Sequence, residues 1–274
     1  MEYLFKHFKD FEEQLKNRRL FLFVDYDGTL TPIVEKPHLA VISSSVRNLL
    51  FLLSTLPGCR LAVVSGRALG NVKKKVNLKT IIYVGNHGLE IRGPKIKFKS
   101  PIAQDYRKVF GRLKNELTKR LKGIKGVMIE DKGLTLGVHY RLVKERQRAR
   151  VKTIFCETTV LDSVRGKVKK AQGKMVLEIR PPIEWNKGKA VLWLCARQKY
   201  IGKNNKLPIY LGDDQTDEDA FRALNGKGIT IYVGEKNSKF SAQYYLKNAN
   251  DVVRFLKKIL DIKTSERENG NKAG

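Results

Sequence analysis

Two carboxylates one residue apart end the apolar run at residues 20–24. Gly28 and Thr29 follow Asp25 and Asp27, so the backbone can turn sharply and offer amide groups to an anion. Open α/β sheets place their ligands at the carboxyl ends of such buried strands. Two acids this close repel each other, so they share a proton or bind a cation. The pair predicts a metal site where one carboxylate accepts a phosphoryl group and its neighbour protonates the leaving oxygen.

A second apolar run, at residues 60–64, ends in Ser65, Gly66 and Arg67. A serine hydroxyl beside glycine suits a phosphate oxygen, although a serine that caps a helix gives the same pattern.

A third group begins with Asn186, which can cap a helix whose first turn holds Lys187 and Lys189. A cation at a helix N-terminus opposes the helix dipole, so a lysine there indicates a nearby anion. We favour Lys187 as the phosphate-binding lysine.

A fourth group concentrates acids after the apolar run at residues 207–211. Hard oxygen ligands without histidine or cysteine favour Mg²⁺ over zinc, and we predict Asp213 and Asp214 as the metal acids. The acids at 217–219 also suit the first turn of a helix.

In this order and spacing, the chain resembles the haloacid dehalogenase superfamily, and within it the trehalose-6-phosphate phosphatases. The matching segments are residues 25–30, 65–67, 86–88, 186–188 and 212–218. The resemblance implies that Asp25 is the nucleophile, forming an aspartyl-phosphate, and that Asp27 is the general acid and then the base. It also implies that Ser65, with Gly66 beside it, and Lys187 hold the phosphoryl oxygens.

The resemblance further implies an Mg²⁺ ion bound by Asp25, the backbone carbonyl of Asp27 and Asp213, with Asp214 direct or through water. The expected substrate-binding residues come from both parts of the chain: Arg67, Asn86, His87, Lys174, Glu178 and Arg180. If residues 174–180 form one strand, alternation puts its three charged side chains on one face. The family more often has Glu where this chain has Asn86.

The elements that must position these residues alternate between strand and helix. We expect strands at 20–24, 60–64, 80–84, 207–211 and 228–233, and helices at 1–20, 46–53, 189–199, 217–224 and 251–262. This predicts an α/β fold, a Rossmann-like core of the haloacid dehalogenase type with a parallel sheet, over residues 1–100 and 183–263.

The middle of the chain, residues 101–182, reads as an inserted α+β cap domain. We expect helices at 103–122 and 144–160, and strands at 127–130, 134–140, 164–169 and 174–180. In the family such a cap closes over the substrate and excludes water. Residues 264–274 are polar and predict a disordered tail.

Composition narrows the class of protein. The 274 residues carry a net charge of +28, which in a nucleic-acid-binding protein would mark phosphate contacts, but the excess is spread along the chain. No apolar run approaches the ~18 residues of a membrane span. The three cysteines match no disulfide or metal spacing and are interpreted as buried thiols in a reducing cytosol: Cys59, Cys156 and Cys195.

We therefore predict a cytoplasmic, Mg²⁺-dependent phosphatase that acts on a small sugar phosphate, trehalose 6-phosphate above all. The sequence does not determine the oligomeric state, for which we favour a monomer. No nucleic-acid or membrane partner is expected. The alternatives are a related phosphatase for another sugar phosphate, such as sucrose 6-phosphate or a glycosyl glycerate phosphate, and, more distantly, a basic nucleic-acid-binding protein without catalysis. A basic surface would also steer an anionic substrate toward its pocket.

Overall fold

The computed structural model describes residues 1–101, 106–200 and 205–272, with the backbone alone over 270–272. The chain divides into two compact units, and each is described by itself. Unit 1, the core unit, comprises Met1–Phe98 and Trp185–Gly274, and unit 2 comprises Lys99–Glu184. The boundaries expected from the sequence, after residue 100 and after residue 182, lie two residues from these.

Strands of the core unit form one sheet, which counts nine strands among the described residues, in the order β1-β13-β12-β11-β2-β3-β4-β5-β6. Their bounds are β1 (Glu2–Tyr3), β2 (Arg19–Asp25), β3 (Cys59–Val64), β4 (Ile82–Gly85), β5 (Glu90–Gly93), β6 (Ile96–Lys99), β11 (Lys206–Gly212), β12 (Ile229–Val233) and β13 (Tyr244–Leu246). In this order across the sheet, every neighbouring pair from β1 through β11 to β4 is parallel, and β5 then pairs with β4 in the antiparallel direction. The predicted parallel α/β sheet is confirmed, with each predicted strand found within two residues of its expected ends.

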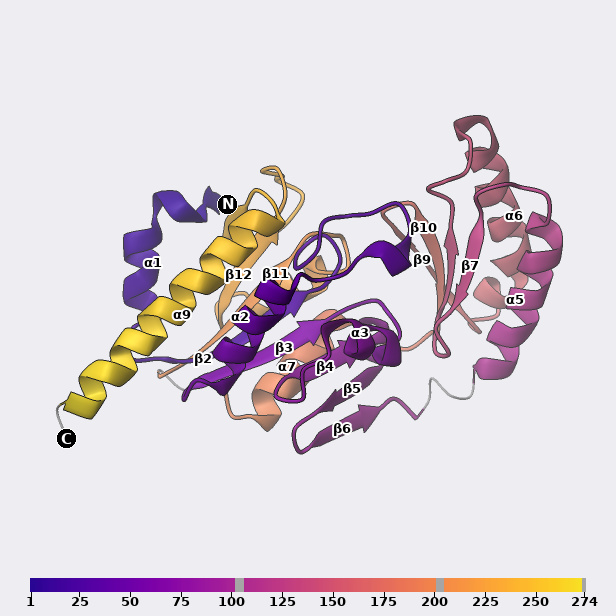
Figure 1. Cartoon of the computed structure of the whole chain (residues 1–274). Coiled ribbons are helices and arrows are strands. Elements are labelled where there is room, and N and C mark those ends of the chain that lie inside the picture. Colours follow the sequence, from indigo (N-terminus) through magenta and orange to yellow (C-terminus); the bar gives the residue numbers. More distant parts are fainter. Residues whose placement is uncertain (102–105, 201–204, 273–274) are drawn as a thin grey trace. The chain divides into compact units, whose positions relative to one another are not determined.

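Helices cover both faces of this sheet (Figure 1). They are α1 (Phe8–Leu15), α2 (Ser44–Thr55), α3 (Leu69–Val76), α7 (Lys187–Arg197), α8 (Glu218–Leu224) and α9 (Ala249–Lys272). Apolar side chains of α1, α2, α3 and α9 share one buried cluster with Leu20, Leu22 and Val24 of β2. Those of α7 and α8 share the other cluster with Phe21 and Phe23. A strand buried on both faces explains why the run at 20–24 is apolar at every position.

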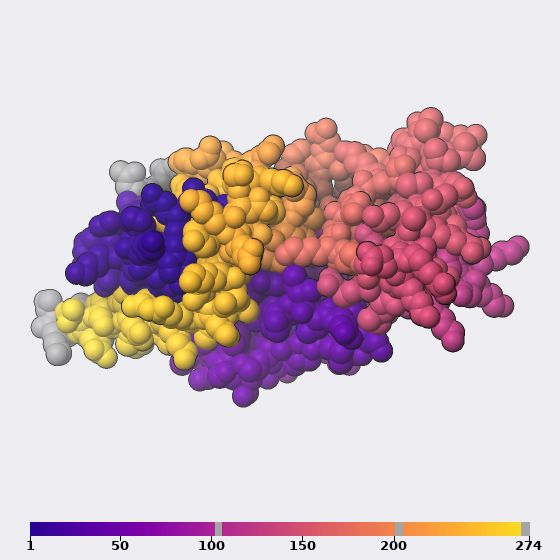
Figure 2. All heavy atoms as spheres, turned by 90° about the horizontal axis from the view of Figure 1, so that it is seen from above, coloured from indigo at the N-terminus to yellow at the C-terminus, as the bar shows by residue number. Residues whose placement is uncertain are grey.

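The first and last helices of the core unit, α1 and α9, lie side by side. Figures 1 and 2 show α1, in indigo, beside α9, in yellow, and Phe11 meets Phe255 edge to face with ring centroids 5.4 Å apart. The expected helix over residues 1–20 is shorter than predicted, because Glu2–Tyr3 adds an edge strand against β13 before α1 begins.

The sequence predicted a disordered tail over residues 264–274, but α9 continues as a helix to Lys272 and the prediction is wrong that far. Residues 273–274 lie outside the described residues. Lys263 Nζ donates to the carbonyls of Leu15 and Arg18 at 2.7 and 2.8 Å, and Glu266 accepts from the Asn17 amide at 2.9 Å. Polar composition alone predicted disorder, but Lys, Glu and Arg are also good helix formers. The side chains of Lys263 and Glu266 bind this part of α9 to the end of α1 and the segment that follows it.

Unit 2 is an antiparallel sheet in the order β7-β8-β10-β9, covered by two helices. Its elements are α5 (Arg107–Leu121), β7 (Met128–Asp131), β8 (Leu136–His139), α6 (Glu145–Val164), β9 (Lys169–Gly173) and β10 (Val176–Arg180). The start expected for the first helix, at residue 103, lies outside the described residues. The strand expected at 164–169 is wrong, because α6 runs to Val164 and strand pairing begins only at Lys169.

Two further expectations are decided by the fold. Cys59 and Cys195 are buried as expected, but Cys156 is exposed on the outer side of α6, so that part of the prediction is wrong. Among the residues described, no helix is both long enough and apolar enough to span a bilayer.

Candidate active site

The acids meet where the strand order reverses. From β2 the chain continues outward through β3 and β4 on one side, while β11 and its successors lie on the other side, so the carboxyl ends of β2 and β11 flank a topological switch point. The register pairs Val24 with Leu211, which brings the residues that follow, Asp25 and Asp213, to the same edge of the sheet. Both carboxylates are almost fully buried, at 4% and 3% exposure.

A third acid completes this group. Carboxylate oxygens of Asp25, Asp213 and Asp217 all lie within 4.8 Å of one another. Within the part of the chain that the structure describes, this is the cluster whose side chains could hold a metal ion. Hard oxygen donors in close array suit Mg²⁺, so the residues present fit such an ion.

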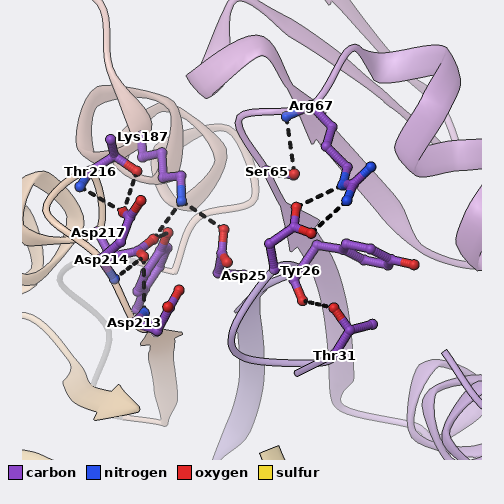
Figure 3. Close-up of polar contacts among 12 residues, drawn as sticks. Asp25, Tyr26, Thr31, Ser65, Arg67, Lys187, Asp213, Asp214, Thr216 and Asp217 are labelled. Carbon is purple, nitrogen blue, oxygen red and sulfur yellow. Dashed lines mark hydrogen bonds and ion pairs between the residues drawn. The ribbon is translucent and has the colours of Figure 1, made fainter. Parts of the chain in front are cut away.

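Lys187 binds two of these acids, as Figure 3 shows. Its Nζ donates to Asp25 Oδ1 and to Asp217 Oδ1, each at 2.7 Å, and the side chain is 2% exposed. Asn186 caps α7 by accepting from the Lys189 amide at 2.9 Å, which places Lys187 at the first helical position. The alternative Lys189 is exposed.

Charge and burial compete strongly here. Burial lowers the pKa of Lys187, but the carboxylates of Asp217 and Asp25 outweigh burial and raise this pKa well above its ordinary value. Burial raises the pKa of Asp25, and the neighbouring acids Asp217 and Asp213 add to this rise, while Lys187 opposes it. The site therefore favours an additional positive charge next to Asp25.

Asp217 is the residue whose role was missed in the sequence. Its Oδ1 accepts from the Tyr210 hydroxyl at 2.6 Å, and its Oδ2 accepts from the backbone amides of Asp213 and Asp214 at 3.0 and 3.1 Å. It thus holds the loop that presents Asp213. The signal in the sequence was the glycine at position 212. Only a glycine leaves room for the Asp217 side chain there, because a Cβ would lie 2.2 Å from the Asp217 carboxyl carbon.

The side chain of Asp214 also contacts Thr216, and its binding to the metal, directly or through water, stays a prediction. Its Oδ1 accepts from the amide and the hydroxyl of Thr216, both at 2.7 Å. Burial raises the pKa of Asp214, but the Lys187 charge and these two hydrogen bonds prevail and lower it. Through Oδ1, this carboxylate helps to shape the loop.

Asp27 points to a different partner. Arg67 Nε donates to Asp27 Oδ2 at 2.7 Å and Arg67 Nη2 to Asp27 Oδ1 at 2.6 Å, a two-pronged pair. The Asp27 side chain remains 43% exposed, whereas that of Arg67 is 7% exposed. The guanidinium of Arg67 therefore pairs with the predicted general acid, and its predicted contact with the substrate stays a prediction.

Ser65 lies at the end of β3 and is buried. Its Oγ accepts from the Arg67 amide at 3.1 Å, and since α3 begins only at Leu69, Ser65 is not the N-cap of that helix. Gly66 admits the His87 ring, because a Cβ at Gly66 would lie 2.4 Å from His87 Cε1.

Asn86 and His87 follow β4 with left-handed backbone angles, φ 49° and 56°. Asn86 Nδ2 donates to Glu90 Oε2 at 2.8 Å, and the His87 amide donates to the Ser65 carbonyl at 3.1 Å. The structure thus brings both residues beside the Ser65–Arg67 turn in the core unit.

In unit 2, Glu178 is buried between two cations. Lys132 Nζ donates to its Oε1 at 2.7 Å, and Arg180 Nε donates to its Oε2 at 3.0 Å. Glu178 and Arg180 share a face of β10, as alternation predicted, but Lys174 does not belong to that face. Lys174 and Met175 form the turn between β9 and β10, with Met175 at φ 65°, so the strand begins two residues later than expected.

The comparisons with known proteins follow the same arrangement. The family model described as trehalose-phosphatase matches residues 23–250, which includes every candidate site residue described above. The chain belongs to the trehalose-phosphatase family.

Curated relatives support this membership over most of the chain. The probable trehalose-phosphate phosphatase 3 of Oryza sativa subsp. japonica is 36% identical, over 90% of this chain and 71% of its own length. Trehalose-phosphate phosphatase B of Arabidopsis thaliana is 33% identical, over 93% of this chain and 70% of its own length. The enzyme class expected from the sequence, a phosphatase of this family, is confirmed.

Solved structures agree on the fold. The trehalose-6-phosphate phosphatase C-terminal domain of C. albicans superposes with a TM-score of 0.79 at 26% identity, covering 93% of this chain and 97% of that one. A haloacid dehalogenase-like hydrolase from Bacteroides thetaiotaomicron superposes with a TM-score of 0.61 at 14% identity, over 88% and 99% of the two chains, and supports the fold alone.

Proposed function

We propose that this protein hydrolyses trehalose 6-phosphate to trehalose and inorganic phosphate. The observation that carries the proposal is the family match over residues 23–250, since it spans the cluster of Asp25, Lys187 and Asp213. The buried acid–lysine cluster supplies the groups that a phosphoryl transfer requires: a nucleophile, a fixed cation and oxygen ligands for a metal.

In the first half of the proposed reaction, a carboxylate oxygen of Asp25 attacks phosphorus and the bond from phosphorus to the sugar oxygen breaks. Asp27 gives its proton to that oxygen, so trehalose leaves as a neutral alcohol. Lys187 and Ser65 hold the phosphoryl oxygens, and positioning supplies much of the rate.

In the second half, water attacks the aspartyl-phosphate on Asp25 and Asp27 accepts the proton of that water. The phosphorus–oxygen bond to Asp25 breaks, which releases phosphate and restores the carboxylate. Mg²⁺ would be held by Asp25, Asp213 and the Asp27 carbonyl, with Asp214 direct or through water, and would neutralise negative charge on the phosphoryl group. The close approach of the Asp25 and Asp213 carboxylates supports this choice of ligands.

Unit 2 is proposed to act as the cap that recognises the sugar. The buried, doubly paired Glu178 offers a carboxylate held rigid by Lys132 and Arg180. A rigid acceptor of this kind suits the hydroxyl groups of a glucose ring.

The function is tested on a panel of sugar phosphates that includes trehalose 6-phosphate, sucrose 6-phosphate and a glycosyl glycerate phosphate. Phosphate release is measured with Mg²⁺ and with a chelator. We expect trehalose 6-phosphate to have the highest kcat/KM and the chelator to abolish turnover. A higher kcat/KM for another sugar phosphate would contradict the proposed substrate, and full activity in chelator would contradict the metal.

A further inference from the structure

The guanidinium of Arg67 donates four hydrogen bonds to protein oxygens. Its Nε and Nη2 bind the two carboxylate oxygens of Asp27 at 2.7 and 2.6 Å, Nη2 also donates to the Pro37 carbonyl at 2.7 Å, and Nη1 donates to Asn71 Oδ1 at 3.1 Å. Every nitrogen of the guanidinium is therefore engaged within the core unit. Such a group is poorly placed to contact a substrate as well.

Arg67 lies two residues before α3 begins and is tied to that helix by its hydrogen bond to Asn71. Lys75 follows Asn71 by four residues and so lies on the same face of α3, and we call Arg67, Asn71 and Lys75 the α3 ladder. Lys75 Nζ donates to the carbonyls of His38 and Ala40 at 2.9 and 2.8 Å. The ladder thus binds three carbonyls of one loop, residues 36–40.

The same loop is tied to the residue between the two catalytic acids. The Tyr26 hydroxyl donates to the Ala40 carbonyl at 3.0 Å, and the Arg67 guanidinium lies over the Tyr26 ring, 5.3 Å from its centroid. Asp27, Arg67 and loop 36–40 consequently form one connected network. Displacement of the loop would disturb Arg67 Nη2, which is shared between Pro37 and Asp27.

This network has a specific consequence for Asp27. Its side chain is 43% exposed, so without a partner it would sample several rotamers, and both of its oxygens are instead fixed by a planar fork. Lysine in place of arginine cannot reproduce a two-pronged contact of this kind.

We propose that the α3 ladder positions Asp27. Arg67 fixes the orientation of the Asp27 carboxyl group, Asn71 holds Arg67 in place, and Lys75 holds loop 36–40 in place. The proposal rests on the proposed role of Asp27 as the general acid.

The test compares two leaving groups. A sugar alkoxide needs a proton from Asp27 in order to leave, whereas 4-nitrophenolate is a good leaving group that needs none. For Arg67→Gln, we expect kcat/KM with trehalose 6-phosphate to fall by about 30- to 100-fold, and kcat/KM with 4-nitrophenyl phosphate to fall less than about threefold. The ratio kcat/KM is compared because it reports the steps up to departure of the leaving group and excludes the later hydrolysis of the aspartyl-phosphate, in which Asp27 serves both substrates. Arg67→Lys should restore only part of the loss.

A second variant keeps the test valid if Arg67→Gln does not fold. Lys75→Met removes the donors to loop 36–40, is far from the Asp25 cluster in sequence, and should lower kcat/KM for trehalose 6-phosphate by roughly three- to tenfold with the same leaving-group selectivity. Amide hydrogen exchange over residues 36–40 should become faster in this variant. Lys74→Met, an exposed lysine on the same helix, is the matched control and should change neither measurement.

Equal losses of kcat/KM on both substrates, or a rise in KM for trehalose 6-phosphate with kcat unchanged, would overturn the positioning role. Failure of the proposed function is a separate outcome, because it appears as absence of trehalose 6-phosphate turnover in the unsubstituted protein. Asp27→Asn is assayed on the same two substrates. It gives the difference between the two losses that is expected when the acid itself is removed, and the Arg67 and Lys75 variants are compared with it.

Discussion

Removal of the Lys187 ammonium should destabilise the core unit far more than removal of any exposed lysine. Lys187→Met keeps the aliphatic stem but leaves Asp25 and Asp217 buried without the cation that lies 2.7 Å from each. Breaking a buried ion pair by deleting one partner costs about 3–5 kcal/mol. For a unit of this size, that corresponds to a fall in Tm of roughly 6–20 °C.

The measurement is thermal unfolding followed by tryptophan fluorescence, in chelator so that no divalent cation replaces the lost charge. Both tryptophans, Trp185 and Trp193, belong to the core unit, so the signal reports its unfolding. Lys189→Met, an exposed lysine two residues along the same helix, is the control, with an expected change within about 0.5 kcal/mol.

A double variant separates lost charge balance from lost packing. Adding Asp25→Asn to Lys187→Met removes one of the two stranded carboxylates and should recover part of the lost stability. Equal Tm values for Lys187→Met and Lys189→Met, or a further full loss in the double variant, would refute the reasoning.

Three other predictions test other parts of the molecule. Gly28→Ala should raise the Mg²⁺ concentration for half-maximal activity about tenfold, since its Cβ would lie 2.1 Å from Asp213 Oδ2 at φ +87°, while Gly70→Ala, with open space around its Cβ, should leave it unchanged. Unchanged metal dependence of Gly28→Ala would contradict the close packing. Glu178→Gln should raise KM for trehalose 6-phosphate about tenfold without affecting 4-nitrophenyl phosphate, and an equal effect of Glu116→Gln would remove the argument for recognition by Glu178. Burial raises the pKa of Cys59 and of Cys195 to about 12, so a thiolate-specific reagent at neutral pH should label Cys156 alone, and rapid native labelling of Cys59 or Cys195 would show that the buried cluster opens.

The sequence was most informative where strands end. The apolar runs at 20–24 and 207–211 are buried on both faces of a parallel sheet, so their composition predicts the strands, and the acids that follow must meet at one edge. Lys187 could be preferred over Lys189 because a cation at a helix N-terminus requires an anion. Local pattern and dipole arguments were sufficient for these residues.

Other features depended on contacts that local patterns do not encode. Asp217 resembles an ordinary acid in a first helical turn, and only the fold brings it to Lys187, Tyr210 and two backbone amides. The pairing of Arg67 with Asp27 joins residues forty positions apart. Lys174 was placed on a strand because alternation alone does not locate the turn that precedes Val176. Tertiary pairing decided each of these cases.

The central claim is that Asp25 is phosphorylated during hydrolysis of trehalose 6-phosphate. The most direct measurement is rapid acid quenching of the enzyme with phosphate-labelled substrate, reduction of the acyl phosphate with borohydride, and peptide mass spectrometry to locate the reduced residue. The account predicts a label that appears and decays during turnover, with reduction at Asp25, and its absence in Asp25→Asn but not in the exposed control Asp10→Asn. Turnover without any acyl phosphate, or reduction at another residue, would contradict it.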